Sequence, residues 1–267
     1  MKLIAIDSSG LTATVACMDG ETIMGEYTIQ YKKTHSQTLL PMIDEVVRMI
    51  EWDLKEMDAI AVAAGPGSFT GLRIGAATAK GLGLALNIPI VPVPTLEGLA
   101  YNLYGGFGES LVCQMMDARR NQVYAGIYEF TPTNTDEVSL HEIWKGQAAA
   151  VTDVLQAVNA LGKPVTFLGD GVTVQKEYIK SQCHVPYTFA PPHMIRQKAG
   201  AVAALGMRYL AAGKAVPASE FKPMYFRLSQ AERERMERER MEHEQAERGQ
   251  MEQCTGREPI QQEKSTS

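Results

Sequence analysis

The chain has 267 residues, of which 26 are basic and 31 acidic, so its formal net charge is −5. This length can bury a large core, and the acidic balance gives no sign of a free-standing nucleic-acid-binding domain, so we expect any contact with RNA to be indirect or shared with a basic partner. The four cysteines form no C-x-x-C pair, which argues against a zinc site and a disulfide framework, and no apolar run predicts a signal peptide or a membrane span, so we expect a cytoplasmic protein.

The first hundred residues predict three strands followed by alternating helices and strands. Apolar or alternating runs over 2–9, 12–20 and 22–30 are typical of a strand meander. Thr34 and Gln37 form a capping box before a helix in which Pro41 should cause a kink or shift the start. The remaining elements are a strand at 59–65, a glycine turn, a helix at about 71–86, a strand at 89–95 and a helix at 96–103.

The same order, βββαβαβα, returns in the second half. The predicted strands cover 110–118, 122–130, 140–146, 164–170 and 187–190, and the predicted helices cover 148–161, 172–182 and 194–212. Asp7 and Asp117 each close the first strand of a copy. This duplicated α/β pattern resembles the actin-like superfamily of actin, sugar kinases and Hsp70, in which two lobes close on a nucleotide. We therefore expect lobes at 1–106 and 107–228, with the helix at about 194–212 packing on the first lobe.

A charged extension, 229–267, is predicted to follow the lobes. Its first part, 229–248, holds seven glutamates and five arginines and almost no apolar residue, so it indicates a solvated helix without a core. The polar residues from Gly249 onward are typical of a disordered tail.

The stretch GPGSFTGLRIG, 65–75, reads as a tight turn before a helix. It lacks the Gly-Lys pair of a phosphate-binding loop, and its glycines are spaced one residue too far apart for a dinucleotide-binding turn. Gly65 and Gly67 permit a sharp structural turn. The N–H groups of this turn could also attract an anion, and both interpretations stay open at this point.

Five segments, AIDSS, HSQTLLPMI, GPGSFTGLRIG, DARRNQVY and PMYFRLSQAER, together resemble the bacterial TsaB (YeaZ) family. The resemblance covers residues 1 to about 233. It implies a two-lobed protein without catalytic activity of its own, which binds and activates the catalytic subunit TsaD. With TsaD and the small ATPase TsaE, it serves the addition of threonylcarbamoyl to N6 of adenosine 37 in tRNAs reading codons that begin with A. The H-x-x-x-H motif of TsaD is absent, because Leu39 stands four residues after His35.

The residues themselves favour a protein without a catalytic site. Asp7, Ser8 and Ser9 form a first turn that could contact a nucleotide or anion, but Arg119 and its neighbours put bulky side chains in the second. Arg119 could still bind an anion. No metal site or nucleophile–base pair is evident, so we expect no cofactor of its own, with ATP or ADP at an interface of the complex. An active kinase or ATPase, or a peptidase acting on TsaD, stays the alternative.

Two helices are predicted to form the partner surface. Small residues at four-residue intervals on the second helix suggest a groove for another helix, and apolar residues on more than one side of the first helix suggest a surplus face. Packing of the small-residue face on this protein's own sheet is the alternative, because helices of an α/β lobe also need a face for the sheet. In the TsaB family these helices pack against TsaD, or against a second TsaB when TsaD is absent, and tRNA is met only through the complex. The predicted interface residues are Leu39, Met42, Ile43, Val46, Met49, Gly71, Gly75, Ala79 and Gly83.

Overall fold

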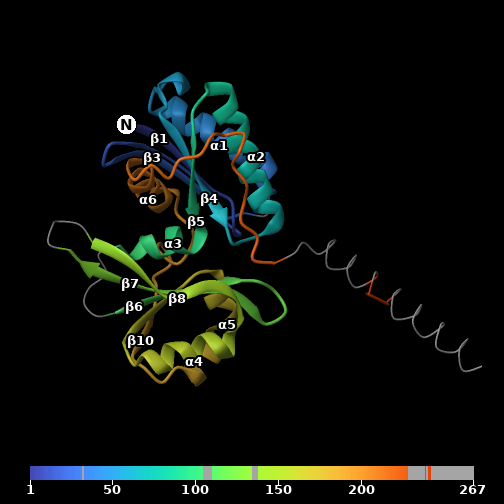
Figure 1. Ribbon diagram of the computed structural model, residues 1–267, viewed down its shortest axis with the longest axis vertical. Helices are drawn as coiled ribbons and strands as arrows, with labels where there is room; N and C mark the ends of the chain where they lie inside the picture. The colour runs from blue at the N-terminus through green and yellow to red at the C-terminus, as the bar shows by residue number, and fades with distance from the viewer. Residues whose placement is uncertain (32, 105–109, 134–137, 228–237, 239, 242–267) are drawn as a thin grey trace, which may run out of the picture. The chain divides into compact units, whose positions relative to one another are not determined.

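The computed structural model describes residues 1–31, 33–104, 110–133, 138–227, 238, 240 and 241 (Figure 1). Contacts divide the chain into a body, Met1–Phe226, and a C-terminal segment, Arg227–Ser267. The predicted lobe boundary at 106 lies outside the described residues, as does the charged helix except for three helical positions, Arg238, Arg240 and Met241.

Among the described residues, the first half of the body forms a five-stranded sheet in the order β3-β2-β1-β4-β5. β1 and β2 are antiparallel, as are β2 and β3, whereas β4 runs parallel to β1 and β5 parallel to β4. The strands are β1 (Lys2–Asp7), β2 (Ala13–Asp19), β3 (Thr22–Ile29), β4 (Ala59–Gly65) and β5 (Ile90–Pro94). The helices are α1 (His35–Met49), α2 (Phe69–Leu86) and α3 (Thr95–Ala100), with short 3-10 turns at Leu54–Glu56 and Tyr101–Leu103.

The second half of the body repeats this topology, with the strand order β10-β9-β6-β7-β8 in the described residues. Its strands are β6 (Leu111–Asp117), β7 (Gln122–Pro132), β8 (Val138–Ala150), β9 (Val165–Leu168) and β10 (Tyr187–Phe189). Its helices are α4 (Val151–Leu161), α5 (Asp170–Gln182) and α6 (Ala199–Ala211). Both halves therefore read βββαβαβα, which confirms the predicted duplicated, actin-like α/β fold.

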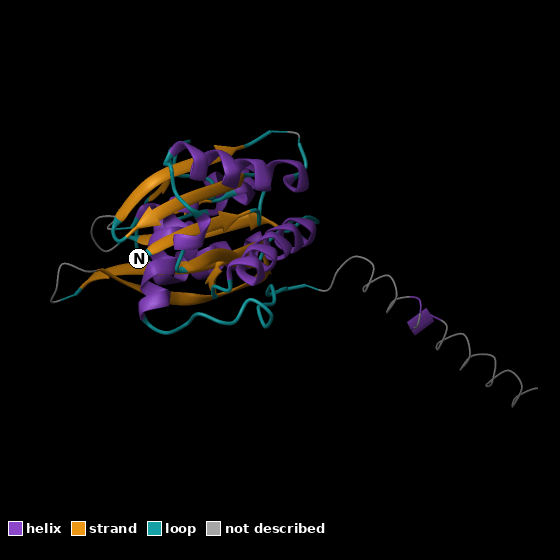
Figure 2. Cartoon of the chain, turned by 90° about the horizontal axis from the view of Figure 1, so that it is seen from above, coloured by secondary structure: helices purple, strands orange, loops and turns teal. Residues whose placement is uncertain are grey.

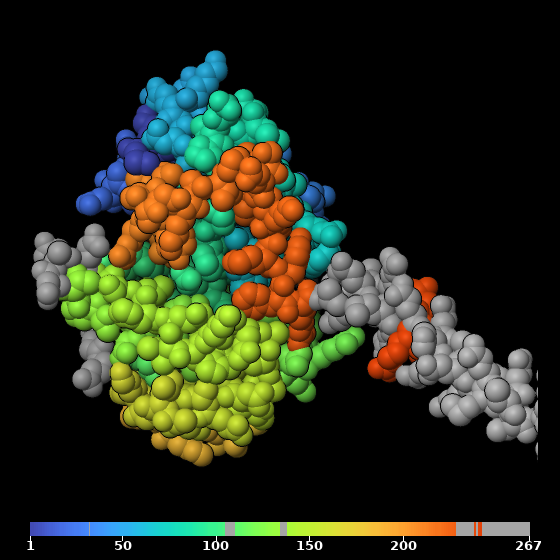
Figure 3. Space-filling model, viewed as in Figure 1, coloured from blue at the N-terminus to red at the C-terminus, as the bar shows by residue number. Residues whose placement is uncertain are grey.

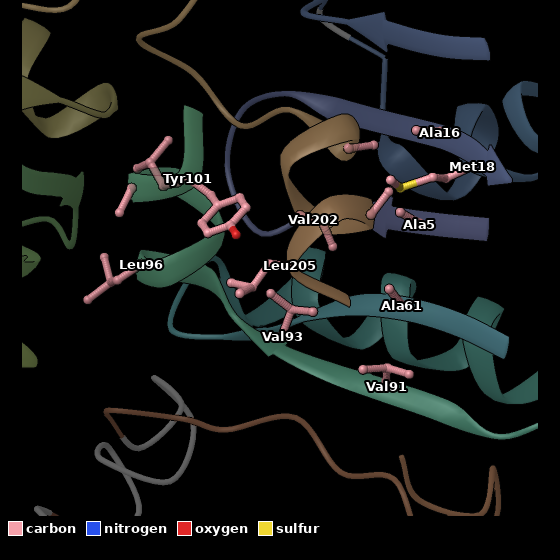
Figure 4. Packing of buried hydrophobic residues seen from close by; sticks show 14 of the residues in the cluster. Ala5, Ala16, Met18, Ala61, Val91, Val93, Leu96, Tyr101, Val202 and Leu205 are labelled. Carbon is pink, nitrogen blue, oxygen red and sulfur yellow. The ribbon is translucent and has the colours of Figure 1, made fainter. Parts of the chain in front are cut away.

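Helices cover both faces of the first sheet (Figures 1 and 2). α1 and α2 pack on one face, and α6 crosses β1, β2, β4 and β5 on the other. The side chains of β1 alternate accordingly, because Leu3 and Ala5 join the α6 side of the core while Ile4 and Ile6 join the α1–α2 side. Figure 4 shows Val202 and Leu205 of α6 beside residues of these strands. The last helix of the body thus completes the first sheet.

The predicted capping box at the start of α1 is wrong, because Gln37 N–H donates to the Thr34 carbonyl while the Thr34 side chain makes no cap bond. Pro41 lies inside α1, which begins at His35, so the proline does not shift the start of the helix; the kink stays a prediction.

Tertiary contacts explain the two misplaced helix starts. Residues 148–150 were predicted as helix but extend β8, where Ala148 pairs with Tyr124 of β7. α6 begins at Ala199 and not near 194, because an irregular segment at 194–198 precedes it. Strand pairing and contacts with both halves decide these boundaries against local propensity.

Candidate functional site

The first candidate corner lies where β1 ends at Asp7. This carboxylate is buried, and its Oδ1 accepts hydrogen bonds from the Ser9 N–H at 2.8 Å and the Ser9 hydroxyl at 2.6 Å. Burial raises the pKa of Asp7 to about 6, although the bonds from Ser9 and the nearby His35 oppose the rise. His35 Nε2 lies 2.9 Å from the Gly10 carbonyl oxygen, which ties α1 to the same turn.

The glycine turn packs directly against this corner. A Cβ on Gly67 would lie 2.4 Å from the Ser9 carbonyl oxygen, and one on Gly71 would lie 2.1 Å from the Ser8 carbonyl oxygen. Ser68 N–H donates to the Ser9 carbonyl at 2.7 Å, and the Ser8 hydroxyl donates to the Gly71 carbonyl at 2.9 Å. The glycines therefore serve a close approach of two backbone segments.

Three N–H groups of the turn, those of Gly65, Ser68 and Gly71, are engaged inside the protein. Gly65 N–H donates to Thr95 Oγ1 at 3.0 Å and Gly71 N–H to Ser68 Oγ at 3.3 Å. Gly65 has φ +120°, and a Cβ there would lie 2.1 Å from the Met224 carbonyl oxygen, so the turn also faces the C-terminal part of the body. This arrangement favours the structural interpretation of the turn over an anion cradle.

The second corner gathers two carboxylates and an arginine at the ends of β6 and β9. Asp117 N–H donates to Asp170 Oδ1 at 3.0 Å, and Asp117 Oδ1 accepts from the Arg119 N–H at 2.9 Å. Burial raises the pKa of Asp170, while the bond from Asp117 and the attraction of Arg196 lower it. Gly169, with φ +108°, makes the close approach to β6, because its Cβ would lie 2.2 Å from the Met115 carbonyl oxygen.

Arg119 lies on a hairpin turn with an unusual backbone. Arg119, Arg120 and Asn121 all have positive φ values, at 63°, 55° and 56°. The Arg119 side chain is 84% exposed and its Nε lies 3.8 Å from Asp117 Oδ2. These three side chains occupy the turn where the resemblance to nucleotide-binding relatives would require small residues, which argues against a conventional phosphate turn.

The irregular segment 194–198 connects the two corners. Its Ile195 carbonyl accepts from the Gly169 N–H at 2.8 Å, and Ala199 N–H donates to Thr14 Oγ1 at 3.1 Å. The Gln197 amide lies where a Cβ on Gly10 would be, 2.6 Å from its Nε2. Gln197 is buried without a hydrogen bond to either amide atom, and Arg196 Nη1 is also buried and unbonded. Sequence reasoning missed this segment, because nothing in its residue pattern marks it.

The predicted nucleotide contacts are only partly brought together. Asp7, Ser8 and Ser9 share the first corner, whereas Arg119 belongs to the second; the Asp7 carboxylate accepts from Ser9, and the Arg119 side chain pairs with Asp117. The described residues also contain no cluster of three histidine, cysteine or carboxylate side chains that could hold a metal ion. Nucleotide contact at Asp7, Ser8, Ser9 and Arg119 stays a prediction.

The prediction that the small residues of α2 form an exposed groove is wrong. Gly71, Gly75, Ala79 and Gly83 are buried, and the small-residue face meets this protein's own strands and turns. A Cβ on Gly75 would lie 2.6 Å from Ser8 Oγ and one on Gly83 would lie 2.8 Å from Ala218 Cβ. The four-residue spacing therefore reflects packing on the chain's own sheet.

Most of the predicted interface residues of α1 are also buried in the chain's own core. Leu39, Met42, Ile43 and Val46 are at most 6% exposed, whereas Met49 is 68% exposed. The expectation that the first four lie on a free face is wrong, because they pack on the sheet.

Other apolar side chains of the two helices do face outward. Leu40 is 55% and Leu84 60% exposed, so with Met49 they give α1 and α2 an apolar outer side. A cavity of about 530 Å³ lies beside α1 and is lined by residues of β3 and α1 that include Tyr27, Tyr31 and Pro41. The interface role of these helices stays a prediction. The exposed side chains of Leu40, Met49 and Leu84, and not the buried residues, are the ones that could contact a partner.

The duplicated topology of two five-stranded mixed sheets with their helices defines an actin-like α/β protein. A family model described as "TsaD: tRNA N6-adenosine threonylcarbamoyltransferase" matches residues 22–234. The chain is 31% identical over 232 residues to the tRNA threonylcarbamoyladenosine biosynthesis protein TsaB of Bacillus subtilis, covering 87% of this chain and 96% of that protein. The chain belongs to the TsaB (YeaZ) family.

Two further comparisons agree. TsaB of Escherichia coli is 32% identical over 147 residues, which is 55% of this chain and 60% of that protein. The solved structure of YeaZ from Pseudomonas aeruginosa superposes with a TM-score of 0.70 at 26% identity, covering 84% of this chain and all of that one. Among the described helices, none has the length and apolar content that a membrane span requires.

Proposed function

We propose that this chain is the non-catalytic subunit that binds and activates a TsaD catalytic subunit in the N6-threonylcarbamoylation of adenosine 37 of tRNA. The similarity to TsaB of Bacillus subtilis and of Escherichia coli, both named as tRNA threonylcarbamoyladenosine biosynthesis proteins, supports a role in this biosynthesis. One observation supports the non-catalytic assignment: the N–H groups of Ser9, Gly65, Ser68 and Gly71 all donate to acceptors within this chain.

The outer side of α1 and α2 is the surface that we assign to the TsaD homologue. Leu40, Met49 and Leu84 are large apolar side chains that the described body leaves exposed, and methionine adapts to more than one partner. The same surface serves a homodimer when TsaD is absent. TsaE joins the complex, and ATP or ADP binds at an interface of the complex, not in this chain alone.

Association with the TsaD homologue of the same cell tests the proposal. The wild-type chain is expected to bind it at micromolar concentration and to be required for threonylcarbamoylation in a reconstituted reaction. Leu84→Glu and Met49→Glu should abolish both, because each places a charge in an apolar contact, without changing the unfolding midpoint of the chain.

Val174→Glu on α5 is the matched control, because Val174 is 64% exposed on a different helix. It is expected to leave association and activity unchanged. Failure of the wild-type chain to bind the TsaD homologue would refute the proposal. Magnesium-dependent hydrolysis of ATP that Asp7→Ala abolishes would also refute it, and would identify the chain as an enzyme of the same superfamily.

A further inference from the structure

Two pairs of aromatic rings involve the segment that follows α6; Tyr225 and Phe226 of this segment are exposed, and their ring partners Phe69 and Tyr124 are half-buried. The Phe69 and Tyr225 ring centroids are 4.9 Å apart, and those of Phe226 and Tyr124 are 6.2 Å apart. Tyr225 and Phe226 follow each other in the chain, so the four rings join the start of α2 to β7. Met224, Tyr225 and Phe226 are 42%, 41% and 38% exposed, and Figure 3 shows the segment that follows α6 on the surface of the molecule. We call these four rings the aromatic strip.

Positive charge accompanies the aromatic strip. The Arg73 guanidinium lies 4.0 Å from the centroid of the Phe69 ring. The turn with Arg119 and Arg120 belongs to the same hairpin as Tyr124 and is exposed. Residues 65–75, 118–124 and 221–226 contain no acidic residue, so Asp117 is the acidic partner of this hairpin turn in the described chain.

The N-terminus of α2 adds to this positive field. α2 has 18 residues, begins at Phe69 itself and carries no acidic residue in its first turn. Its positive dipole end therefore lies beside the first ring of the strip. The two exposed rings, Tyr225 and Phe226, and the exposed arginines of the hairpin turn match the two requirements of a single-stranded nucleic acid, which stacks its bases and pairs its phosphates with cations.

We propose that the aromatic strip and its arginines bind a single-stranded segment of RNA directly. This inference rests on the proposed function, because tRNA is the substrate of the proposed reaction and is therefore the RNA that we expect to bind. It assigns to this chain a substrate-contacting surface within the complex, separate from the outer side of α1 and α2. A protein partner is the competing occupant, and the arginines Arg73, Arg119 and Arg120 near these rings favour a polyanion, although Asp117 and Glu220 adjoin the same segments.

Fluorescence anisotropy of the full chain with a labelled RNA hairpin tests the proposal. The hairpin carries a seven-nucleotide loop, and the comparison probe is a blunt RNA duplex of the same length. The wild-type chain is expected to bind the hairpin more tightly than the duplex in 50 mM salt. Tyr225→Ala with Phe226→Ala should weaken hairpin binding about tenfold or more, because each ring stacks on a base.

Arg119→Gln with Arg120→Gln should lower the slope of log affinity against log salt by about 1.4, because two phosphate contacts to a single strand are lost. The matched controls are Tyr178→Ala on α5 and Arg48→Gln on α1, which are exposed elsewhere on the body. Neither control should change affinity or slope. Tyr225→Leu with Phe226→Leu keeps apolar packing and removes the rings, so it supplies the same test if the alanine variant unfolds.

Three results would overturn the proposal. These are no saturable binding of the hairpin by the wild-type chain, equal binding of the duplex, and equal weakening by the control variants. Pull-down of the TsaD homologue separates this outcome from failure of the proposed function. If the strip variants lose TsaD and keep RNA, the strip is a protein interface; if TsaD binding persists while RNA never binds, only the RNA proposal fails.

Discussion

Adding a single methyl group at Gly71 should destabilise the folded monomer. The new Cβ would lie 2.1 Å from the Ser8 carbonyl oxygen, a contact that only a backbone shift relieves. Overpacking of this kind costs about 1 to 3 kcal/mol, which offsets the gain of up to about 1 kcal/mol from replacing glycine in a helix. Gly71→Ala is therefore expected to lower the free energy of unfolding by up to about 2 kcal/mol.

Gly81→Ala on the same helix is the matched control. Nothing lies within 4 Å of the added atom, so this variant should gain up to about 1 kcal/mol in the free energy of unfolding. Urea unfolding followed by circular dichroism measures both, and each kcal/mol moves the melting temperature of a chain of this size by about 2 to 4 °C. A midpoint for Gly71→Ala equal to that of Gly81→Ala would refute the close-approach argument.

Burial raises the pKa of Asp7 from 3.8 to about 6, so between these pH values the folded chain retains a proton that the unfolded chain releases. The free energy of unfolding should therefore fall by about 2 to 3 kcal/mol as the pH rises from 4 to 6. Asp7→Asn should flatten this fall in urea unfolding at each pH; an unchanged slope would assign it to another group. Phe221→Ala, which truncates a side chain 2% exposed, should lower the free energy of unfolding by about 3 to 5 kcal/mol. Ending the chain after Arg227 should leave the melting temperature unchanged, since 229–267 has no apolar stripe; a drop of several degrees would show that this segment docks on the body.

The order of elements was predictable because each is coded locally. The alternation in 2–30 and the apolar spacing after His35 give strands and a helix without knowledge of the rest of the chain. What the sequence did not reveal was which face of α2 meets the sheet. A row of small residues allows close packing on any neighbour, so the Gly71–Gly83 spacing was assigned to a partner although it fits Ser8 and Ala218.

The candidate site was predictable only at its strand ends. Asp7 stands out because it closes a buried strand before a turn, and the glycines at 65 and 67 mark the need for a tight turn. Gln197 gave no signal, because its burial depends on contact with Gly10, more than a hundred residues earlier in the chain. Likewise, the exposure of Tyr225 and Phe226 follows from where the segment after α6 runs.

The position of α6 has a consequence for how the protein is made. A nascent chain that has left the ribosome only as far as Tyr104 already contains all five strands of the first sheet, yet the face that carries Leu3 and Ala5 has nothing to cover it. That face remains exposed to solvent until residues 199–211 leave the ribosome, roughly a hundred residues later. Val216 then pairs with Ile90 and Met224 N–H with the Ala64 carbonyl. Translation must therefore run almost to the end of the body before its first half can fold, which makes this half a natural client for chaperones that bind exposed apolar strands.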